Sequence, residues 1–183
     1  MNSNTIAVMP QCSPSGNVTA ETAFGLAPGN TVRAFVALPT YLGNAGADGR
    51  EWMLRVCWEV TTGGAFTWGP SIRLYSGGNT GLTTFTNDTA IITPTPPTVS
   101  TATRLIGITA ILQYQPSLGV NARLNGRYAW NMDATYTNWV TVTGALNSGV
   151  GSESLIQFCC TGIFGTGNAS NTAILKYFEI DQL

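Results

Sequence analysis

The chain has 183 residues and a formal net charge of −1 at pH 7, and only 9% of its residues are charged, against about 25% in ordinary soluble proteins. This balance removes any general electrostatic case for binding nucleic acid or an anionic membrane. The sequence has no histidine, which excludes Ser-His-Asp and Cys-His catalysis and the histidine zinc motifs, so a pair of carboxylates is the remaining route to catalysis.

Residues 1–20 are polar, contain Pro10 and Pro14, and show no hydrophobic periodicity. They are typical of an N-terminal arm, and residues 21–183 are long enough to form a single domain with a sizeable core. The chain shows no signal-peptide pattern and no apolar stretch of membrane-span length. We therefore expect a protein that is made in a cytoplasm and has no membrane partner.

The first strand signals lie at residues 31–38 (TVRAFVAL) and 52–60 (WMLRVCWEV), on either side of a glycine-rich loop. In the second segment every other residue is large and apolar, which predicts a strand with one buried face. The residues of this face are Trp52, Leu54, Val56, Trp58 and Val60.

Short extended segments follow, separated by glycine or proline. Strands are expected at 66–68, 71–76 and 81–86. The run TPTPPT at 93–98 cannot donate hydrogen bonds to a central ladder, so it is expected to be a connector or an edge crossing.

The next segment, RLIGITAILQYQ at 104–115, is the longest apolar strand candidate. Beyond it, Asn125-Gly126 lies between two extended runs, and this dipeptide is the strongest short signal for a hairpin with a type I′ turn. The stretch TYTNWVTVTG at 135–144 alternates well, and we expect Trp139 to lie with the apolar residues.

The C-terminal third predicts a final strand pair, 154–165 and 172–183, joined by TGNASN. In the last strand, Ile174, Phe178 and Ile180 are expected on one face, with Lys176 interrupting it.

The adjacent Cys159 and Cys160 point to opposite faces of an extended chain, so they cannot share a metal ion without a break in the strand. Cys12 and Cys57 are distant and form no CxxC spacing. We interpret the cysteines as small apolar side chains of a sheet near the core, because free cysteine is among the most buried residue types.

About eight to ten short strands with turn signals at regular spacing, and no helix signal longer than a turn, predict an all-β fold. The expected architecture is an antiparallel β-sandwich of jelly-roll type, with one domain over residues 21–183.

The carboxylates offer no catalytic pair. Glu51 and Glu59 bracket one strand and would lie roughly 26 Å apart, farther than the roughly 5–9.5 Å that glycosidases need. Glu179 and Asp181, which share a strand with Tyr177, are expected to meet basic residues of a neighbour. The remaining loop candidates, interpreted as solvated turn residues, are Asp48, Asp88, Asp133 and Glu153.

The glycine-rich GGNTG and GTGN segments do not follow the phosphate-loop pattern. We therefore assign no catalytic, cofactor-binding or metal-binding residue. Several aromatic residues lie near expected turns, where they could form a platform for sugars or simply cover the rims of the sandwich. These residues are Tyr41, Trp68, Tyr75, Tyr128, Trp130 and Tyr136.

A chain of this composition, ending in FGTGNASNTAILKYFEIDQL, resembles the small virion proteins of tailed bacteriophages, above all the capsid decoration or cement proteins. The resemblance implies a non-enzymatic structural role: a homotrimer in the virion, bound to the major capsid protein or other virion proteins and stabilising the head. The alternative is a carbohydrate- or receptor-binding module of a phage fibre or a lectin-like protein. A glycan-cleaving enzyme is disfavoured by the missing carboxylate pair.

Overall fold

The computed structural model describes residues 4–9, 22–23, 35–38, 51–76, 89–115, 123–145 and 156–183. Every regular element in these ranges is a β-strand, as the β-branched, helix-poor composition favours. None of the described segments forms a helix with the length and hydropathy of a membrane span.

Seven of the described strands form one antiparallel sheet, here called sheet A, in the order β1-β13-β4-β8-β9, with β10 and β11 both paired to β9. Its strands are β1 (Asn4–Met9), β13 (Thr172–Gln182), β4 (Glu51–Thr61), β8 (Arg104–Gln115), β9 (Arg123–Met132), β10 (Thr135–Tyr136) and β11 (Val140–Ala145).

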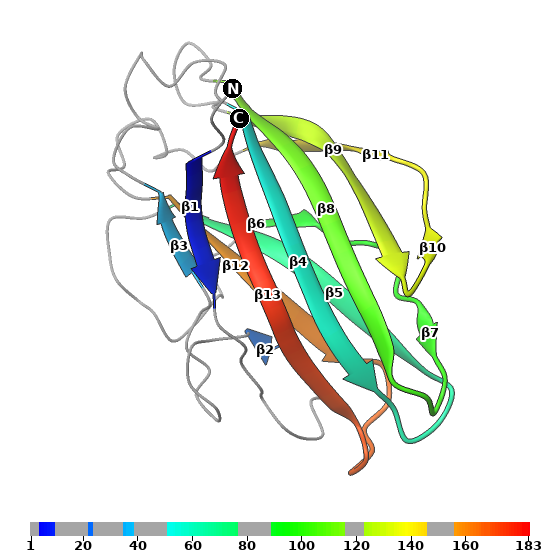
Figure 1. Ribbon diagram of the computed structural model, residues 1–183. Coiled ribbons are helices and arrows are strands. Elements are labelled where there is room, and N and C mark those ends of the chain that lie inside the picture. The colour runs from blue at the N-terminus through cyan, green and yellow to red at the C-terminus, as the bar shows by residue number, and fades with distance from the viewer. Residues whose placement is uncertain are drawn as a thin grey trace.

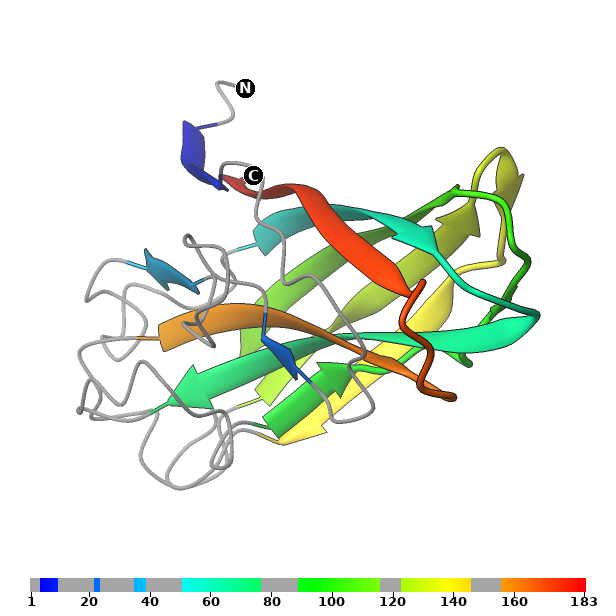
Figure 2. The ribbon, with the colours of Figure 1, turned by 90° about the horizontal axis from the view of Figure 1, so that it is seen from below.

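Six described strands form sheet B, in which β12 and β5 are central. Its strands are β2 (Thr22–Ala23), β3 (Phe35–Leu38), β12 (Ile156–Phe164), β5 (Phe66–Ser76), β6 (Thr89–Ile92) and β7 (Thr98–Val99). Sheet A lies in front of sheet B in Figure 1, and Figure 2 shows the two sheets as separate layers. The predicted all-β antiparallel sandwich is confirmed, while its jelly-roll connectivity stays a prediction.

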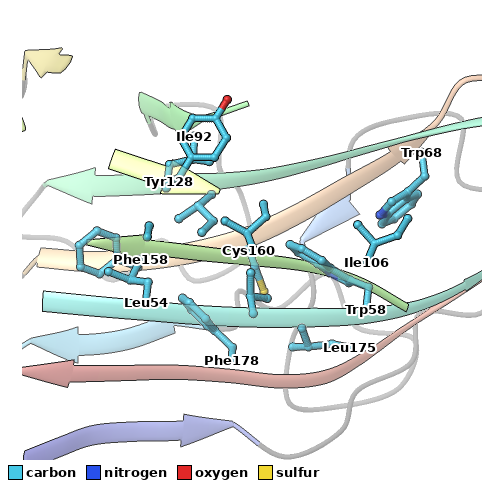
Figure 3. Packing of buried hydrophobic residues seen from close by; sticks show 14 of the residues in the cluster. Leu54, Trp58, Trp68, Ile92, Ile106, Tyr128, Phe158, Cys160, Leu175 and Phe178 are labelled. Atoms are coloured by element: carbon cyan, nitrogen blue, oxygen red, sulfur yellow. The ribbon is translucent and has the colours of Figure 1, made fainter. Parts of the chain in front are cut away.

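The core lies between the sheets and begins with the inner face of β4, where Trp52 is 3% exposed and Trp58 is fully buried. The prediction for this strand is therefore confirmed. Figure 3 shows Trp58, Phe178 and Cys160 in one cluster, contributed by both sheets. Gly162 of β12 makes room for Trp68, because an added Cβ would lie 2.0 Å from the indole ring.

The predicted hairpin at Asn125-Gly126 is wrong, because both residues lie inside β9 and pair with Gln113 and Leu112 of β8. Gly126 allows the backbones of β8 and β9 to approach closely and does not form a turn. A Cβ on Gly126 would lie 2.0 Å from the backbone oxygen of Ile111, so only glycine fits at this point.

The predicted pairing of the two C-terminal strands is also wrong. β12 pairs with β2, β3 and β5 in sheet B, whereas β13 pairs with β1 and β4 in sheet A. The loop 165–171 therefore crosses from one sheet to the other. In β13 a bulge between Leu175 and Tyr177 changes the phase, so Ala173 and Leu175 are buried with Phe178, while Ile174 lies on the opposite face.

The strands expected at 66–68 and 71–76 are one continuous strand, β5, that runs through Pro70. Within the described residues, the pairing of β5 with β7 ends at Thr67 and its pairing with β6 begins at Ile72. Pro70 is opposite Gly162 of β12, but on the other edge of β5 it lies in the gap between β7 and β6, where a missing N–H is tolerated.

Other predictions fall as follows. The strand at 104–115 is confirmed as β8, and residues 93–97 connect β6 to β7 without a strand, as expected. The described part of the segment 31–38 is β3, and the segment 81–86 lies outside the described residues. Within the expected arm, Asn4–Met9 form β1, which pairs with β13 at the edge of sheet A.

We predict that Trp58→Ala lowers the free energy of unfolding by about 3–5 kcal/mol, because it removes a large, fully buried side chain and leaves a cavity. Chemical denaturation followed by tryptophan fluorescence and circular dichroism measures this loss. The matched control is Leu105→Ala on the neighbouring strand, where the side chain is 45% exposed and the expected loss is below about 0.5 kcal/mol. Equal losses for the two variants would contradict the assigned core.

Candidate functional site

Sheet A has one face on the core and one directed away from sheet B, and this second face, here called the outer face, carries the candidate site. On β4 the residues between the buried ones, such as Arg55 and Glu59, point to the outer face. The strand register places Thr109 of β8 and Glu179 of β13 beside Arg55. Ala129 of β9 lies beside Thr109.

The charged side chains at the β13–β4 side of this face form ion pairs. The Nε atom of Arg55 lies 3.4 Å from Glu179, and its Nη2 atom donates to Asp181. Asp181 is only 3% exposed, so the guanidinium provides the compensation that a buried carboxylate requires. Lys176 lies 3.3 Å from Glu59. The basic residue that Glu179 and Asp181 meet is thus on the adjacent strand of the same chain.

The thiol of Cys57 lies on the same face but is only 9% exposed. Burial raises the pKa of this thiol; Lys176 opposes the shift and Glu59 adds to it. Cys57 and the core residue Cys160 are free thiols, and no group of three metal-binding side chains occurs among the described residues. Cys12 and the side chain of Cys159 lie outside the described residues.

Small residues occupy the middle of the outer face. They are Gly107 and Thr109 on β8 and Ala129 on β9, and we call them the central lane. An added Cβ on Gly107 would lie 2.5 Å from the side-chain oxygen of Asn131, and Gly107 itself is buried, so the Asn131 amide covers this position. The partly exposed floor of the lane is formed by Thr109 and Ala129, with the Asn131 amide at its end.

Trp139 borders the lane on the side of β11 and is 48% exposed. The guanidinium carbon of Arg127 lies 5.0 Å from the centre of its ring, a cation–π distance. Arg127 therefore supports the indole and holds it on the outer face.

A groove of about 450 Å³ lies next to Arg127 at the end of the face where β4 begins. It crosses from β4 to β11 and presents carboxylate, amide, guanidinium and hydroxyl groups together with two apolar side chains. Its lining residues are Glu51, Ile111, Gln113, Asn125, Gly126, Arg127, Thr141 and Leu183.

A bulge between β10 and β11 places Tyr136 and Trp139 on the same face. Tyr136 pairs with Asn131, and Val140 pairs with Tyr128, so an advance of four residues along β10 and β11 matches an advance of three residues along β9. The hydroxyl of Thr137 fills the irregularity by accepting from the Trp130 amide and donating to the Trp130 carbonyl. An extra residue reverses the alternation of faces.

Tyr136 thus points to the outer face with Asn131 and is 73% exposed. Across the lane, Tyr177 is opposite Cys57 on β4 and is 43% exposed. Burial is the main cause that raises the pKa of Tyr177, and the Tyr136 phenol is among the groups that add to the shift. The strand register places the two phenols at opposite ends of one row across sheet A, with Cys57, Gly107 and Asn131 between them.

The turn that carries Tyr136 is fixed by Asp133, which has a positive φ of 51°. Its carboxylate accepts hydrogen bonds from the Leu105 amide at 3.0 Å and from Arg104 at 2.8 Å. The Leu105 hydrogen bond is the main cause that lowers the pKa of this carboxyl, and Arg104 lowers it further. Asp133 thereby ties the β9–β10 turn to β8.

A second hollow of about 400 Å³ lies on sheet B, between β5 and the proline-rich connector. Its described lining offers neither an aromatic ring nor a carboxylate, so the outer face of sheet A is the better candidate. The lining residues are Gly69, Pro70, Ser71, Arg73, Thr93, Pro94, Thr95, Pro96 and Ile163.

The aromatic residues proposed from the sequence divide between core and surface. Trp68 and Tyr128 are buried, Trp130 packs against the core, and Tyr136 is exposed. Tyr41 and the side chain of Tyr75 lie outside the described residues. The expectation that Trp139 joins the apolar core is wrong.

Neither the bulge that directs Tyr136 outward nor the contact between Arg127 and Trp139 was predicted, because neither leaves a periodic pattern in the sequence. The acidic residues considered from the sequence are not brought together. Glu51 and Glu59 lie near opposite ends of β4, and Asp133 is in a turn. The remaining loop candidates lie outside the described residues. These are Asp48, Asp88 and Glu153.

A scan against protein-family models finds no match, and a search of curated proteins finds none either. Solved structures with related shape include the CBM2 module of the evolved Dit of Lactobacillus casei BL23 phage J-1, with 10% identity and a TM-score of 0.41, covering 80% of this chain and 67% of the other.

Two further solved structures are similar. Peanut lectin in complex with a nine-residue peptide has 9% identity and a TM-score of 0.45, covering 100% of this chain and 90% of the other. An engineered GH43 glycoside hydrolase with endo-xylanase and exo-arabinofuranosidase activity has 12% identity and a TM-score of 0.41, covering 84% of this chain and 32% of the other. At these identities and TM-scores the similarity assigns neither a ligand nor a site to this chain.

We predict that Asp133→Asn lowers stability slightly at pH 7, by less than about 1 kcal/mol because the ion pair is exposed. The folded-state pKa of Asp133 is depressed, so its contribution is present above the unfolded-state pKa and is lost as the pH falls through the folded-state value. The difference between wild type and variant, measured by urea denaturation, should therefore shrink as the pH falls below the ordinary aspartate pKa of about 3.9. A difference that stays constant as the pH is lowered further would contradict the role of the charge.

Proposed function

We propose that the protein is a non-enzymatic carbohydrate-binding module whose ligand lies on the outer face of sheet A, beside Trp139. The observation that carries this proposal is a half-exposed indole, held by Arg127 at 5.0 Å, at the border of a polar groove. Sugar rings combine apolar C–H faces with hydroxyl edges. A flat aromatic ring and nearby polar side chains match these two surfaces.

The polar groups of the groove suit hydroxyl recognition. Glu51 accepts hydrogen bonds, Arg127 donates them, and Thr141 can do both, while Ile111 supplies apolar contact. A small number of polar groups in a partly apolar concave surface is the usual composition of a small-molecule site.

The arrangement of the acidic side chains supports binding without hydrolysis. Glycosidases use two carboxyl groups flanking the bond that is cleaved. On the outer face Glu179 and Asp181 are engaged by Arg55, and Glu59 is engaged by Lys176. Among the described residues, Glu51 is the acidic residue that lines the groove, and one carboxylate does not provide the pair.

Capsid decoration, as a homotrimer on the major capsid protein of a virion, is the second candidate. It is supported by β11, which within the described residues pairs with β9 alone and has no charged side chain in its sequence VTVTGA. Such edges pair readily with another chain, because charges usually protect them. Stoichiometric binding to capsids together with no signal on a glycan array would favour this role over carbohydrate binding.

We predict that Trp139→Ala weakens binding to the glycan identified on an array by at least about 2 kcal/mol, or roughly thirtyfold, as truncation of a central binding tryptophan does. Isothermal titration calorimetry measures the change, and thermal unfolding confirms that the variant is folded. Val140→Ala is the control, because it removes another exposed apolar side chain that lies outside the groove, at a position paired with the buried Tyr128 and not on the outer face. Unchanged affinity of Trp139→Ala would remove this residue from the site.

A further inference from the structure

The groove does not end at Arg127, because the central lane continues from it along β8 and β9. Moving along β8, the outer-face residues are Ile111 in the groove, then Thr109, then Gly107. On β9 they are Arg127 in the groove and then Ala129. Gly107 is four residue steps along the strand from Ile111, which corresponds to about 13 Å at the rise of a β-strand.

Aromatic rings border this path on both sides. Trp139 and Tyr136 lie along the β10–β11 edge, and Tyr177 lies across the lane on β13. All three are 43% or more exposed. Between the two tyrosines the floor is the amide side chain of Asn131, which covers the buried Gly107 and whose Nδ2 donates to the Asp133 carbonyl at 2.9 Å.

The charges near the lane are balanced. Arg55 is shared by Glu179 and Asp181, and Lys176 is paired with Glu59. A polyanionic ligand placed on the lane would compete with these carboxylates for their cations, and in the groove its attraction to Arg127 would be opposed by Glu51. The face therefore favours a neutral ligand that is rich in hydroxyl groups.

We propose that the outer face binds a neutral, extended glycan chain that runs along β8 and β9, and not a single sugar residue. The groove beside Trp139 is one subsite, and the floor at the Asn131 amide, between Tyr136 and Tyr177, is a second. This inference rests on the proposed carbohydrate-binding function and adds the length, direction and charge of the ligand.

The test measures affinity against chain length. Isothermal titration calorimetry is done with cello-, xylo- and malto-oligosaccharides from two to six units, and with oligogalacturonates as acidic chains of the same lengths. For the neutral series that binds, we expect the hexasaccharide to bind at least about tenfold more tightly than the disaccharide, or about 1.4 kcal/mol. The acidic series should bind more weakly at every length.

Variants of the second subsite then show where the gain in affinity with chain length arises. Ala129→Gln fills the lane, and Tyr177→Ala removes one aromatic border. In each, the ratio between hexasaccharide and disaccharide affinity should fall toward one. Ala102→Gln is the matched control, because Ala102 is an exposed residue outside the lane and should keep the wild-type ratio. Tyr177→Ala keeps the test valid if Ala129→Gln does not fold.

The outcomes are distinct. Binding of a neutral disaccharide as tightly as the hexasaccharide overturns the extended site but leaves carbohydrate binding in place. Tighter binding of the acidic chains also overturns the neutral extended site and leaves carbohydrate binding in place. So does an unchanged ratio of hexasaccharide to disaccharide affinity in folded Ala129→Gln and Tyr177→Ala. Failure of every oligosaccharide to bind overturns the proposed function, and the extended site with it.

Discussion

The burial of alternate side chains along β4 is the constraint on which the rest of sheet A depends. From Trp52 to Val60 the inner residues are at most 3% exposed, and each contributes about 1.5–3 kcal/mol of hydrophobic stabilisation. A one-residue slip would turn the whole set to solvent. The register of β8 and β13 against β4 is fixed in the same way, and with it the outer-face neighbours of Arg55, namely Thr109 and Glu179.

Regular alternation alone would not produce the candidate site, because both of its aromatic borders depend on an extra residue. On β13 the bulge after Leu175 lets Lys176 pair with Glu59 while Tyr177 also faces outward. On the opposite edge, the irregularity at Thr137 puts Tyr136 on the same face as Trp139. Bulges that redirect a side chain near a functional site are a recurrent feature of sheets.

These dependencies explain what the sequence could and could not predict. The strands at 52–60 and 104–115 were predictable because each carries its own hydrophobic pattern. Gly126 was misread as a turn residue because its role is set by the backbone of Ile111, which is distant in sequence. In the same way, the position of Trp139 depends on a contact with Arg127, twelve residues earlier in the sequence. Non-local contacts of this kind leave no periodic signal.

The exposed aromatic side chains have a further physical consequence for binding. A tryptophan that is free to rotate loses conformational entropy when a ligand orders it. Trp139 follows a segment that Thr137 fastens to both backbone groups of Trp130, and its ring lies against Arg127. Much of this ordering has already occurred in the folded protein, so stacking of a ligand on the open part of the ring needs little reorganisation. A ligand that stacked on this ring would therefore lose less binding free energy to side-chain ordering than one that stacked on a freely rotating tryptophan.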